Sequence, residues 1–144
     1  MASMLKISEA ATLALHSMAF LAANEDKLIT IKEFANTFHA SEAHLSKVLQ
    51  RLAKAGLVKS TRGPRGGFSL EKDSRSISLL DVYEIIDGEI EPANCLLGKP
   101  LYGASECILG GLLSKIDNQV REYMSEKKLS DLACWGKAHE SSVN

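Results

Sequence analysis

The residues of this chain with the most specific chemistry are three cysteines and one histidine. Cys95 and Cys107 bracket the run "CLLGKPLYGASEC", Cys134 follows near the end, and His16 lies in "LALH". Thiolates and imidazole bind transition metals, and thiolates also undergo reversible oxidation. These residues could therefore form a metal centre or a redox switch. An enzyme has little support, because the sequence contains no CxxC or HExxH motif and nothing resembling a Ser/His/Asp triad.

Basic side chains form a second candidate group, in and before the stretch "STRGPRGGFSL" (Ser60–Leu70). Residues 41–68 contain six lysines and arginines against one acidic residue, a net charge of +5. Residues 69–92 carry a net charge of −5, although the whole chain is nearly neutral at −1. This reversal indicates a basic working surface, although a solvated charged face would give the same count. A nucleotide-binding loop has little support, because no GxxxxGK[ST] or GxGxxG motif follows a strand.

Three helices are expected ahead of this stretch. Ser8 caps an apolar helix that runs from about Glu9 to Ala23, and Thr30 forms a capping box with Glu33 before a short helix. A tight turn at "HA" leads to Ser41, the N-cap of "EAHLSKVLQRLAKAG". The apolar residues of this last helix recur at the spacing of one buried stripe: Leu45, Val48, Leu49 and Leu52. Two short helices joined by a tight turn predict a helix-turn-helix.

A β-hairpin is expected directly after the helix-turn-helix. "LVKST" and "GFSLE" alternate apolar and polar residues, and "RGPRGG" between them supplies turn residues. Glycine and proline suit any tight hairpin, but they do not explain Arg62 and Arg65 at its tip. A hairpin after a basic helix is typical of the wing of a winged helix, whose arginines reach DNA phosphates or the minor groove.

This order of elements resembles that of a known family. The run "SEAHLSKVLQRLAKAGLVKSTRGPRGGFSL" is similar to the helix and wing of the Rrf-type winged-helix transcriptional regulators. The likeness extends from "MLKIS" through the first helix and "ISLLDVYEIIDG" into the cysteine-containing stretch, and the tail after about Leu129 lacks a clear counterpart. The resemblance implies a transcriptional regulator, a repressor, that binds double-stranded DNA sequence-specifically.

The resemblance also implies which side chains contact DNA. The expected base contacts lie among Ser41, Glu42, His44, Ser46 and Lys47, and the residues nearer the DNA backbone are Gln50, Arg51 and Lys54. Arg62 and Arg65 of the wing complete the set. His44 stands where many family members have an aromatic residue, so the base sequence that is recognised does not carry over.

Two further helices are expected after the wing. Ser78 and Asp81 form a capping-box pair for a structural helix that packs through Leu80, Val82, Ile85 and Ile86. A longer helix follows, with a narrow apolar seam at 3-4 spacing made of Leu109, Leu112, Ile116, Val120 and Tyr123. Such a seam suits dimerisation, and the resemblance likewise implies a homodimer through this helix.

Between these helices the resemblance implies a sensing loop, and its chemistry stays open. Cluster-binding relatives carry three cysteines here, whereas this chain keeps Cys95 and Cys107 but has Tyr102 and Gly110 near the positions of a cysteine and a histidine. Two thiolates cannot complete a four-ligand iron-sulfur site. Cys134 or the partner subunit would have to contribute, and His16 matches a ligand position on helix 1 of some relatives. The alternatives are an iron-sulfur cluster, a thiol or disulfide switch, and buried structural cysteines.

These observations predict a mainly α fold with a small β-hairpin, namely a winged helix-turn-helix and a long dimerisation helix. The expected parts are a DNA-binding domain at 1–88, a sensing loop at 89–106, the dimerisation helix at 107–128 and a tail at 129–144. A cytoplasmic protein is expected, because "AATLALHSMAFLAA" is too short to span a membrane and no signal-peptide pattern precedes it. The competing interpretation is a small thiol-based redox protein or enzyme that does not bind DNA.

Overall fold

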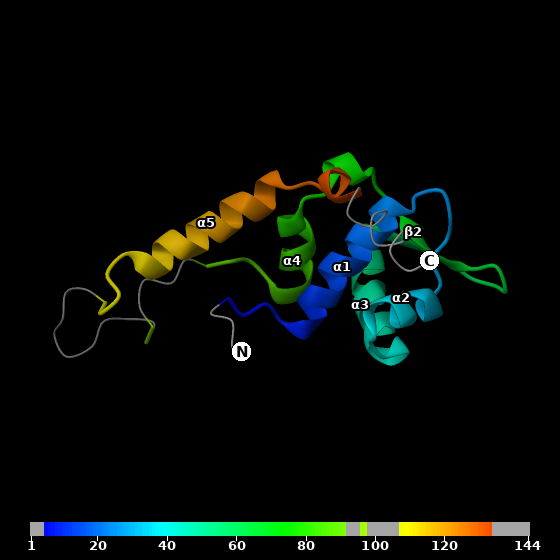
Figure 1. Cartoon of the computed structure of the whole chain (residues 1–144), viewed down its shortest axis with the longest axis horizontal. Coiled ribbons are helices and arrows are strands. Elements are labelled where there is room, and N and C mark those ends of the chain that lie inside the picture. The colour runs from blue at the N-terminus through cyan, green and yellow to red at the C-terminus, as the bar shows by residue number, and fades with distance from the viewer. Residues whose placement is uncertain (1–4, 92–95, 98–106, 134–144) are drawn as a thin grey trace.

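The computed structural model describes residues 5–91, 96–97 and 107–133. Its α-helices are α1 (Glu9–Ala23), α2 (Ile31–Phe38), α3 (Glu42–Lys54), α4 (Leu79–Asp87) and α5 (Leu112–Glu126). The shorter elements are β1 (Val58–Thr61), β2 (Gly67–Leu70), η1 (Ser74–Ser76) and η2 (Leu129–Leu132). Helices α1 to α4 and the hairpin form a head, from which α5 extends as an arm (Figure 1). The expected fold class is confirmed.

Side-chain caps begin the first four helices, as the sequence predicts. The capping residues are Ser8, Thr30, Ser41 and Ser78. At Thr30 and Ser78 both bonds of the capping box form, with Glu33 and Asp81 as the partners. Each cap satisfies backbone N–H groups that have no partner within the helix, which is worth about 1 kcal/mol per helix.

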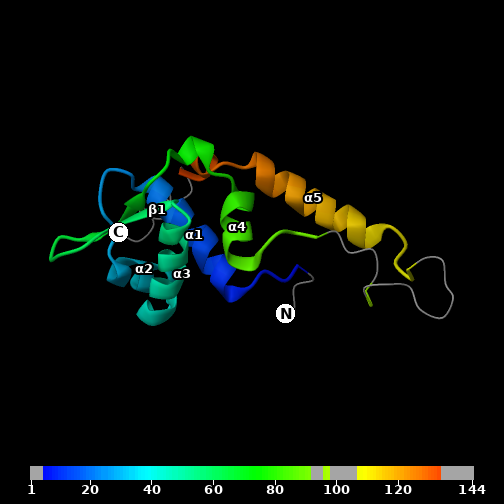
Figure 2. The ribbon, with the colours of Figure 1, turned by 180° about the vertical axis from the view of Figure 1, so that it is seen from behind.

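Helix α1 lies in the middle of the head and supplies much of its core (Figures 1 and 2). Its Met18 and Leu21 are fully buried, and the helix packs against α3, α4 and η2. Phe34 of α2 is also fully buried and contacts Phe20 and Phe68 edge to face. The predicted stripe of α3 is confirmed, because Leu45, Val48, Leu49 and Leu52 are all buried. The core therefore holds α3 by one face and leaves its other face exposed.

The hairpin from residue 58 to 70, called the wing below, is fastened to the head at its base. Strands β1 and β2 pair antiparallel, with Val58 opposite Leu70. Phe68 also forms a β-bridge with Ile29, in which each residue's N–H donates to the other's carbonyl oxygen at 2.8 and 3.0 Å. A Cβ on Gly67 would lie 2.8 Å from the Ile29 oxygen, so only glycine lets the two backbones approach this closely. The loop before α2 therefore sets the direction of the wing.

Three details of the later elements correct the sequence-based expectation. On α4, Val82 and Ile86 are buried as predicted, but Leu79 packs against the core where Leu80 was expected. Helix α5 begins at Leu112, so Leu109 lies in the turn before it. Gly110 in that turn has a φ of 57°, which few other residues adopt.

The third correction concerns the chain after α5. Leu129 is fully buried in the core cluster, and η2 packs against α1. The first residues of the segment expected as the C-terminal tail, 129–144, therefore pack against the head. A β-bridge between Ser78 and Lys128 fastens the end of α5 to the start of α4.

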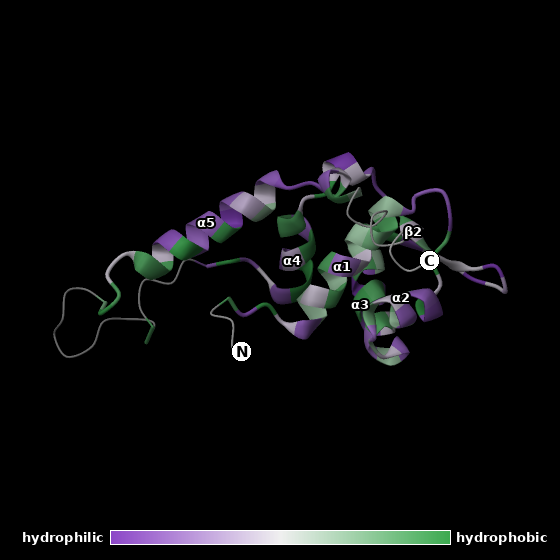
Figure 3. Ribbon diagram, viewed as in Figure 1, coloured by the Kyte–Doolittle hydropathy of each residue, from purple (hydrophilic) through white to green (hydrophobic). Residues whose placement is uncertain are grey.

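Helix α5 carries polar and apolar residues on different sides (Figure 3). Several large apolar side chains remain exposed on it: Leu112 at 47%, Ile116 at 38% and Tyr123 at 59%. No helix in the described part of the chain is long and apolar enough to cross a membrane.

Candidate nucleic-acid interface

The exposed face of α3 presents most of the expected DNA-contacting residues. Helix α2 ends at His39 in a left-handed conformation with a φ of 52°, and a single turn separates it from the N-cap Ser41. The side chains of Glu42, Lys47, Gln50 and Lys54 are exposed, and those of His44 and Ser46 are partly exposed. Gln50 Nε2 donates to Ser46 Oγ at 3.3 Å. The structure thus brings these polar side chains onto one helix whose opposite face is held in the core.

The tip of the wing carries two exposed arginines, Arg62 and Arg65. The turn between them is tight, because Gly66 N–H donates to the Gly63 carbonyl oxygen at 2.9 Å. Gly63 has a φ of 111°, and a Cβ on Gly66 would clash with the Thr61 carbonyl oxygen. The turn therefore requires the glycines, but it does not require the two arginines. Figure 1 shows the wing projecting beyond the helices of the head.

One charged neighbour of this surface is not predicted from the sequence. Glu9, in the first turn of α1, places Oε1 3.8 Å from Nδ1 of His44. The His44 side chain is 33% exposed and that of Glu9 is 81% exposed. No sequence signal reveals this pair, because it depends on how α1 crosses α3.

Arg51 differs from the other expected contacts on α3. Its Nη2 donates to the carbonyl oxygens of Ile85 at 3.1 Å and Ile86 at 3.0 Å, both in the last turn of α4. The resemblance implies a place for Arg51 near the DNA backbone. In the structure Arg51 is exposed, but its guanidinium is already hydrogen-bonded to the end of α4.

Of the candidate metal ligands, the two that the structure describes, Cys107 and His16, are not brought together within one chain. Cys95 and Cys134 lie outside the described residues, and Cys107 is half-buried just before α5. His16 on α1 places Nδ1 2.7 Å from the Thr12 carbonyl oxygen, and its ring contacts Phe38 edge to face. Figures 1 and 2 place the start of α5 at the end of the arm, away from α1. The described residues contain no group of three or more His, Cys, Asp or Glu side chains that could hold a metal ion. They do not by themselves fit a cluster.

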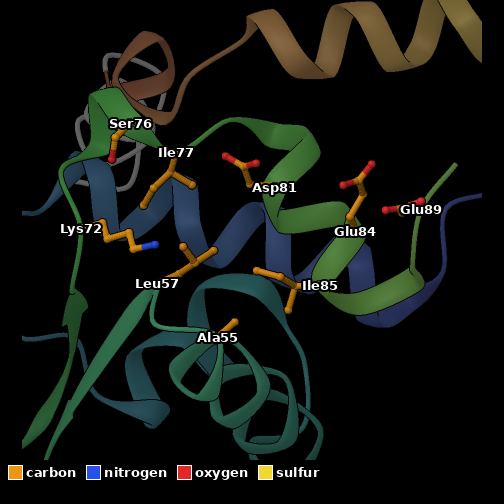
Figure 4. A pocket seen from close by; sticks show the side chains of 9 residues that line it. All are labelled: Ala55, Leu57, Lys72, Ser76, Ile77, Asp81, Glu84, Ile85 and Glu89. Atoms are coloured by element: carbon orange, nitrogen blue, oxygen red, sulfur yellow. The ribbon is translucent and has the colours of Figure 1, made fainter.

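A shallow hollow of about 470 Å³ lies where α4 meets the end of α3 (Figure 4). Its floor includes Leu57 and Ile77, and its polar lining is mainly acidic, with Asp81, Glu84 and Glu89 against Lys72. Carboxylates repel phosphate, so this surface is unsuited to DNA. The acidic half of the charge pattern thus belongs to α4 and its surroundings, and the basic half belongs to α3 and the wing.

The chain is similar to known transcriptional regulators. The Rrf2 family model, described as an iron-dependent transcriptional regulator, matches residues 7–134. A helix-turn-helix transcriptional regulator of Aquifex aeolicus is 30% identical over 128 residues, which cover 87% of this chain and 89% of that protein. The match continues past Leu129, where the likeness was expected to end.

The chain is also similar to solved structures of transcriptional regulators. CymR, the global cysteine regulator of B. subtilis, has a TM-score of 0.77 and 31% identity, covering 92% of this chain and 98% of that chain. The oxidized form of Staphylococcus aureus CymR has a TM-score of 0.73 and 27% identity, covering 90% and 96%. The likeness in structure therefore includes the arm as well as the head.

Proposed function

Because the chain belongs to the Rrf2 family and is a DNA-binding transcriptional regulator, we propose that it acts in the cytoplasm as a homodimeric repressor. In this proposal α3 contacts base edges in the major groove, and the wing contacts the DNA backbone or the minor groove. One observation carries the assignment: the polar face of α3 and the arginine-tipped wing are exposed on a single head, each fastened to the same core. An enzymatic function is not supported, because the relatives are transcriptional regulators.

We infer a division of labour among the residues of this surface. The early part of the helix supplies the proposed base contacts, which are Ser41, Glu42, His44, Ser46 and Lys47. Gln50 and Lys54, with Arg62 and Arg65 of the wing, are proposed to contact the backbone. The exposure of these side chains supports the assignment. Backbone contacts fix the position of a protein on DNA, whereas base contacts specify the sequence.

Dimerisation is proposed to occur through the apolar seam of α5, defined as Leu112, Ile116, Val120 and Tyr123. Three of these side chains rank among the exposed large apolar residues. Their spacing of three and four residues places all four on one side of α5. Contact with a second copy would remove this apolar surface from water. Two heads related by a two-fold axis would match an operator with two half-sites.

The proposed parts are a DNA-binding domain at 1–88, a sensing loop at 89–106 and the dimerisation helix at 107–128. We propose that DNA affinity responds to the state of Cys95 and Cys107. The family is described as iron-dependent, and its relative CymR is a cysteine regulator with an oxidized form. The position of Cys107 supports the proposal, because Cys107 begins the turn that leads into α5 and its carbonyl oxygen accepts from Gly110 N–H at 2.8 Å. A change at Cys107 would therefore act close to the start of the arm. An iron-sulfur cluster would make this response depend on iron, and a thiol switch would make it depend on oxidants.

The wing provides the direct test of DNA binding. We expect Arg62→Ala and Arg65→Ala to weaken binding to every duplex and to lower the log-log salt slope by about 0.9 for each phosphate interaction that the substitution removes. Fluorescence anisotropy with labelled duplexes at several salt concentrations measures both quantities. Arg75→Ala is the control, because it removes the same charge from an exposed residue outside the wing. If both wing variants keep the original affinity and slope, the proposed role of the wing is wrong.

A further inference from the structure

We propose that Arg51 is a positioning residue that holds α3 against α4 and so sets the angle at which the dimer presents its recognition helices. This inference rests on the proposed homodimer and goes beyond it. Arg51 would determine which spacing of half-sites is recognised without touching DNA.

The first support is the contact between Arg51 and α4. The last carbonyl groups of a helix lack partners within that helix and carry partial negative charge. In α4 the oxygens of Ile85 and Ile86 both accept from Arg51 Nη2. A guanidinium suits this task, because it is flat, always charged and able to donate several hydrogen bonds at once. Arg51 thus caps the C-terminus of α4 from a different helix.

The second support is the position of Arg51 around α3. It lies two turns after His44, so both occupy the same flank of the helix. His44 on that flank faces Glu9 of α1, and Arg51 faces α4. Lys47 and Lys54 are likewise two turns apart, but both are exposed on the outer side. All three basic residues of α3 are exposed, but only Arg51 is hydrogen-bonded to α4. Lys47 and Lys54 therefore form the pair that remains available to DNA, and Arg51 is already engaged by the protein.

The third support is the attachment of α4 at its other end. Leu79 N–H donates to the Lys127 carbonyl oxygen at 3.0 Å, and Leu129 N–H donates to the Ile77 carbonyl oxygen at 2.9 Å. These bonds fasten the start of α4 to the end of α5. Helix α4 is thus bound to the end of α5 at one end and to Arg51 of α3 at the other. It connects the dimerisation arm to the recognition helix.

The packing around the contact between α3 and α4 makes the hydrogen bonds of Arg51 important for the angle between the two helices. Ile85 points from α4 toward the end of α3 at Ala55, and the hollow opens beside them (Figure 4). The packing there is open on the side of the hollow, so fewer apolar contacts restrain this end of α4 than a closed core would provide. The two hydrogen bonds of Arg51 add directional restraint. Without these hydrogen bonds we expect the head to stay folded and the angle between α3 and α4 to vary.

The test compares Arg51→Met with Lys54→Met, a matched loss of one basic side chain on the same helix. The full-length proteins are titrated with three duplexes: a two-half-site fragment selected from random sequences by the unaltered protein, the same fragment with base pairs inserted between its half-sites, and a random duplex at several salt concentrations. We expect Arg51→Met to lose about tenfold in affinity for the selected fragment, as for a lost hydrogen bond to a charged group. The ratio of its affinities for the selected fragment and for the fragment with inserted base pairs should be smaller than in the unaltered protein. Its affinity for the random duplex and its salt slope should not change.

Lys54→Met should instead weaken all three complexes alike. Arg51→Lys guards against a folding defect in Arg51→Met, because it keeps the charge but lacks the flat group that reaches both carbonyls. We expect it to show the same loss of spacing discrimination. A lower salt slope in Arg51→Met, or full recovery in Arg51→Lys, would overturn the inference and make Arg51 a phosphate contact. Failure of the unaltered protein to select any two-half-site fragment would defeat the proposed function itself.

Discussion

At the scale of single residues, the charged side chains of the head divide by partner. Arg62 and Arg65 are exposed at the wing tip, whereas Arg51 and Arg75 are engaged by groups of the protein itself. By sequence alone Arg51 groups with Lys54, because both are basic and near the end of one helix. The direction in which each side chain leaves α3 separates them.

The pair formed by Asp73 and Arg75 leads to a prediction about pH. Hydrogen bonds from the Arg75 side chain and backbone lower the pKa of Asp73 from 3.8 to about 2. A carboxyl group whose pKa falls on folding stabilises the protein above its unfolded pKa and loses that contribution as the pH falls through the folded value. We therefore expect this contribution to disappear between about pH 4 and pH 2. Carboxyl chemical shifts followed by NMR should show the low pKa, and Arg75→Met should return it toward 3.8. An Asp73 that titrates near 3.8 in the unaltered protein would contradict the pairing.

At the scale of elements, the wing depends on one close approach of backbones. The hairpin pattern was predicted from alternation and turn residues, and both strands form as expected. Its third partner, Ile29, lies in the loop between α1 and α2, far from the hairpin in sequence. The bridge between Ile29 and Phe68 converts a two-stranded hairpin, which is marginal by itself, into a fixed projection.

Gly67→Ala tests this anchoring. The new Cβ would lie 2.8 Å from the Ile29 carbonyl oxygen, so the strand must move and the bridge should weaken. We expect faster amide hydrogen exchange at Phe68 and lower DNA affinity, with the dimer retained. Gly111→Ala is the matched control, since nothing lies within 4 Å of its added Cβ and its φ is negative. Unchanged exchange at Phe68 would show that the wing tolerates the added carbon.

At the scale of the whole molecule, the division into one head and one arm fits the proposed assembly of two chains. The head buries its apolar core, but the arm keeps large apolar residues in contact with water. The proposed dimer covers this surface, and the attachments at both ends of α4 connect it to the DNA-binding elements.

Charge on the seam should separate the two chains. We expect Leu112→Glu or Ile116→Glu to disrupt the dimer, because an unpaired charge buried in an apolar interface costs several kcal/mol. Binding to a two-half-site duplex should fall with it. Asn118→Glu adds the same charge to an exposed position on another side of α5 and should leave the dimer intact. Sedimentation of the unaltered protein as a monomer at micromolar concentration would exclude the proposed assembly.

The sensing proposal is also tested on the whole protein. We expect Cys95→Ala and Cys107→Ala to abolish the change in DNA affinity that oxidants or iron removal cause in the unaltered protein. Iron, acid-labile sulfide and colour in anaerobically purified protein distinguish a cluster from a thiol switch, and loss of iron in His16→Ala would assign that residue as a ligand. Both forms of sensing would be contradicted if the protein is colourless and free of iron and if neither oxidants nor the cysteine substitutions change its DNA affinity.

The sequence by itself determined the elements whose signals are local. Helix starts at Ser8, Thr30, Ser41 and Ser78 follow from caps within three residues, and the buried face of α3 follows from periodicity. The start of α5 was less well predicted, because Gly110 and Gly111 leave a turn where the apolar spacing alone continues a helix.

Only the tertiary structure decided which distant groups meet. The bonds from Arg51 to α4, the pair of Glu9 with His44, and the bridge from Ile29 to Phe68 each join segments separated by more than a helix. Sequence patterns encode which side of an element is apolar, but not the angle at which two elements cross. That angle depends on how the side chains around α1 pack together, and it determines whether a basic residue faces DNA or a neighbouring helix.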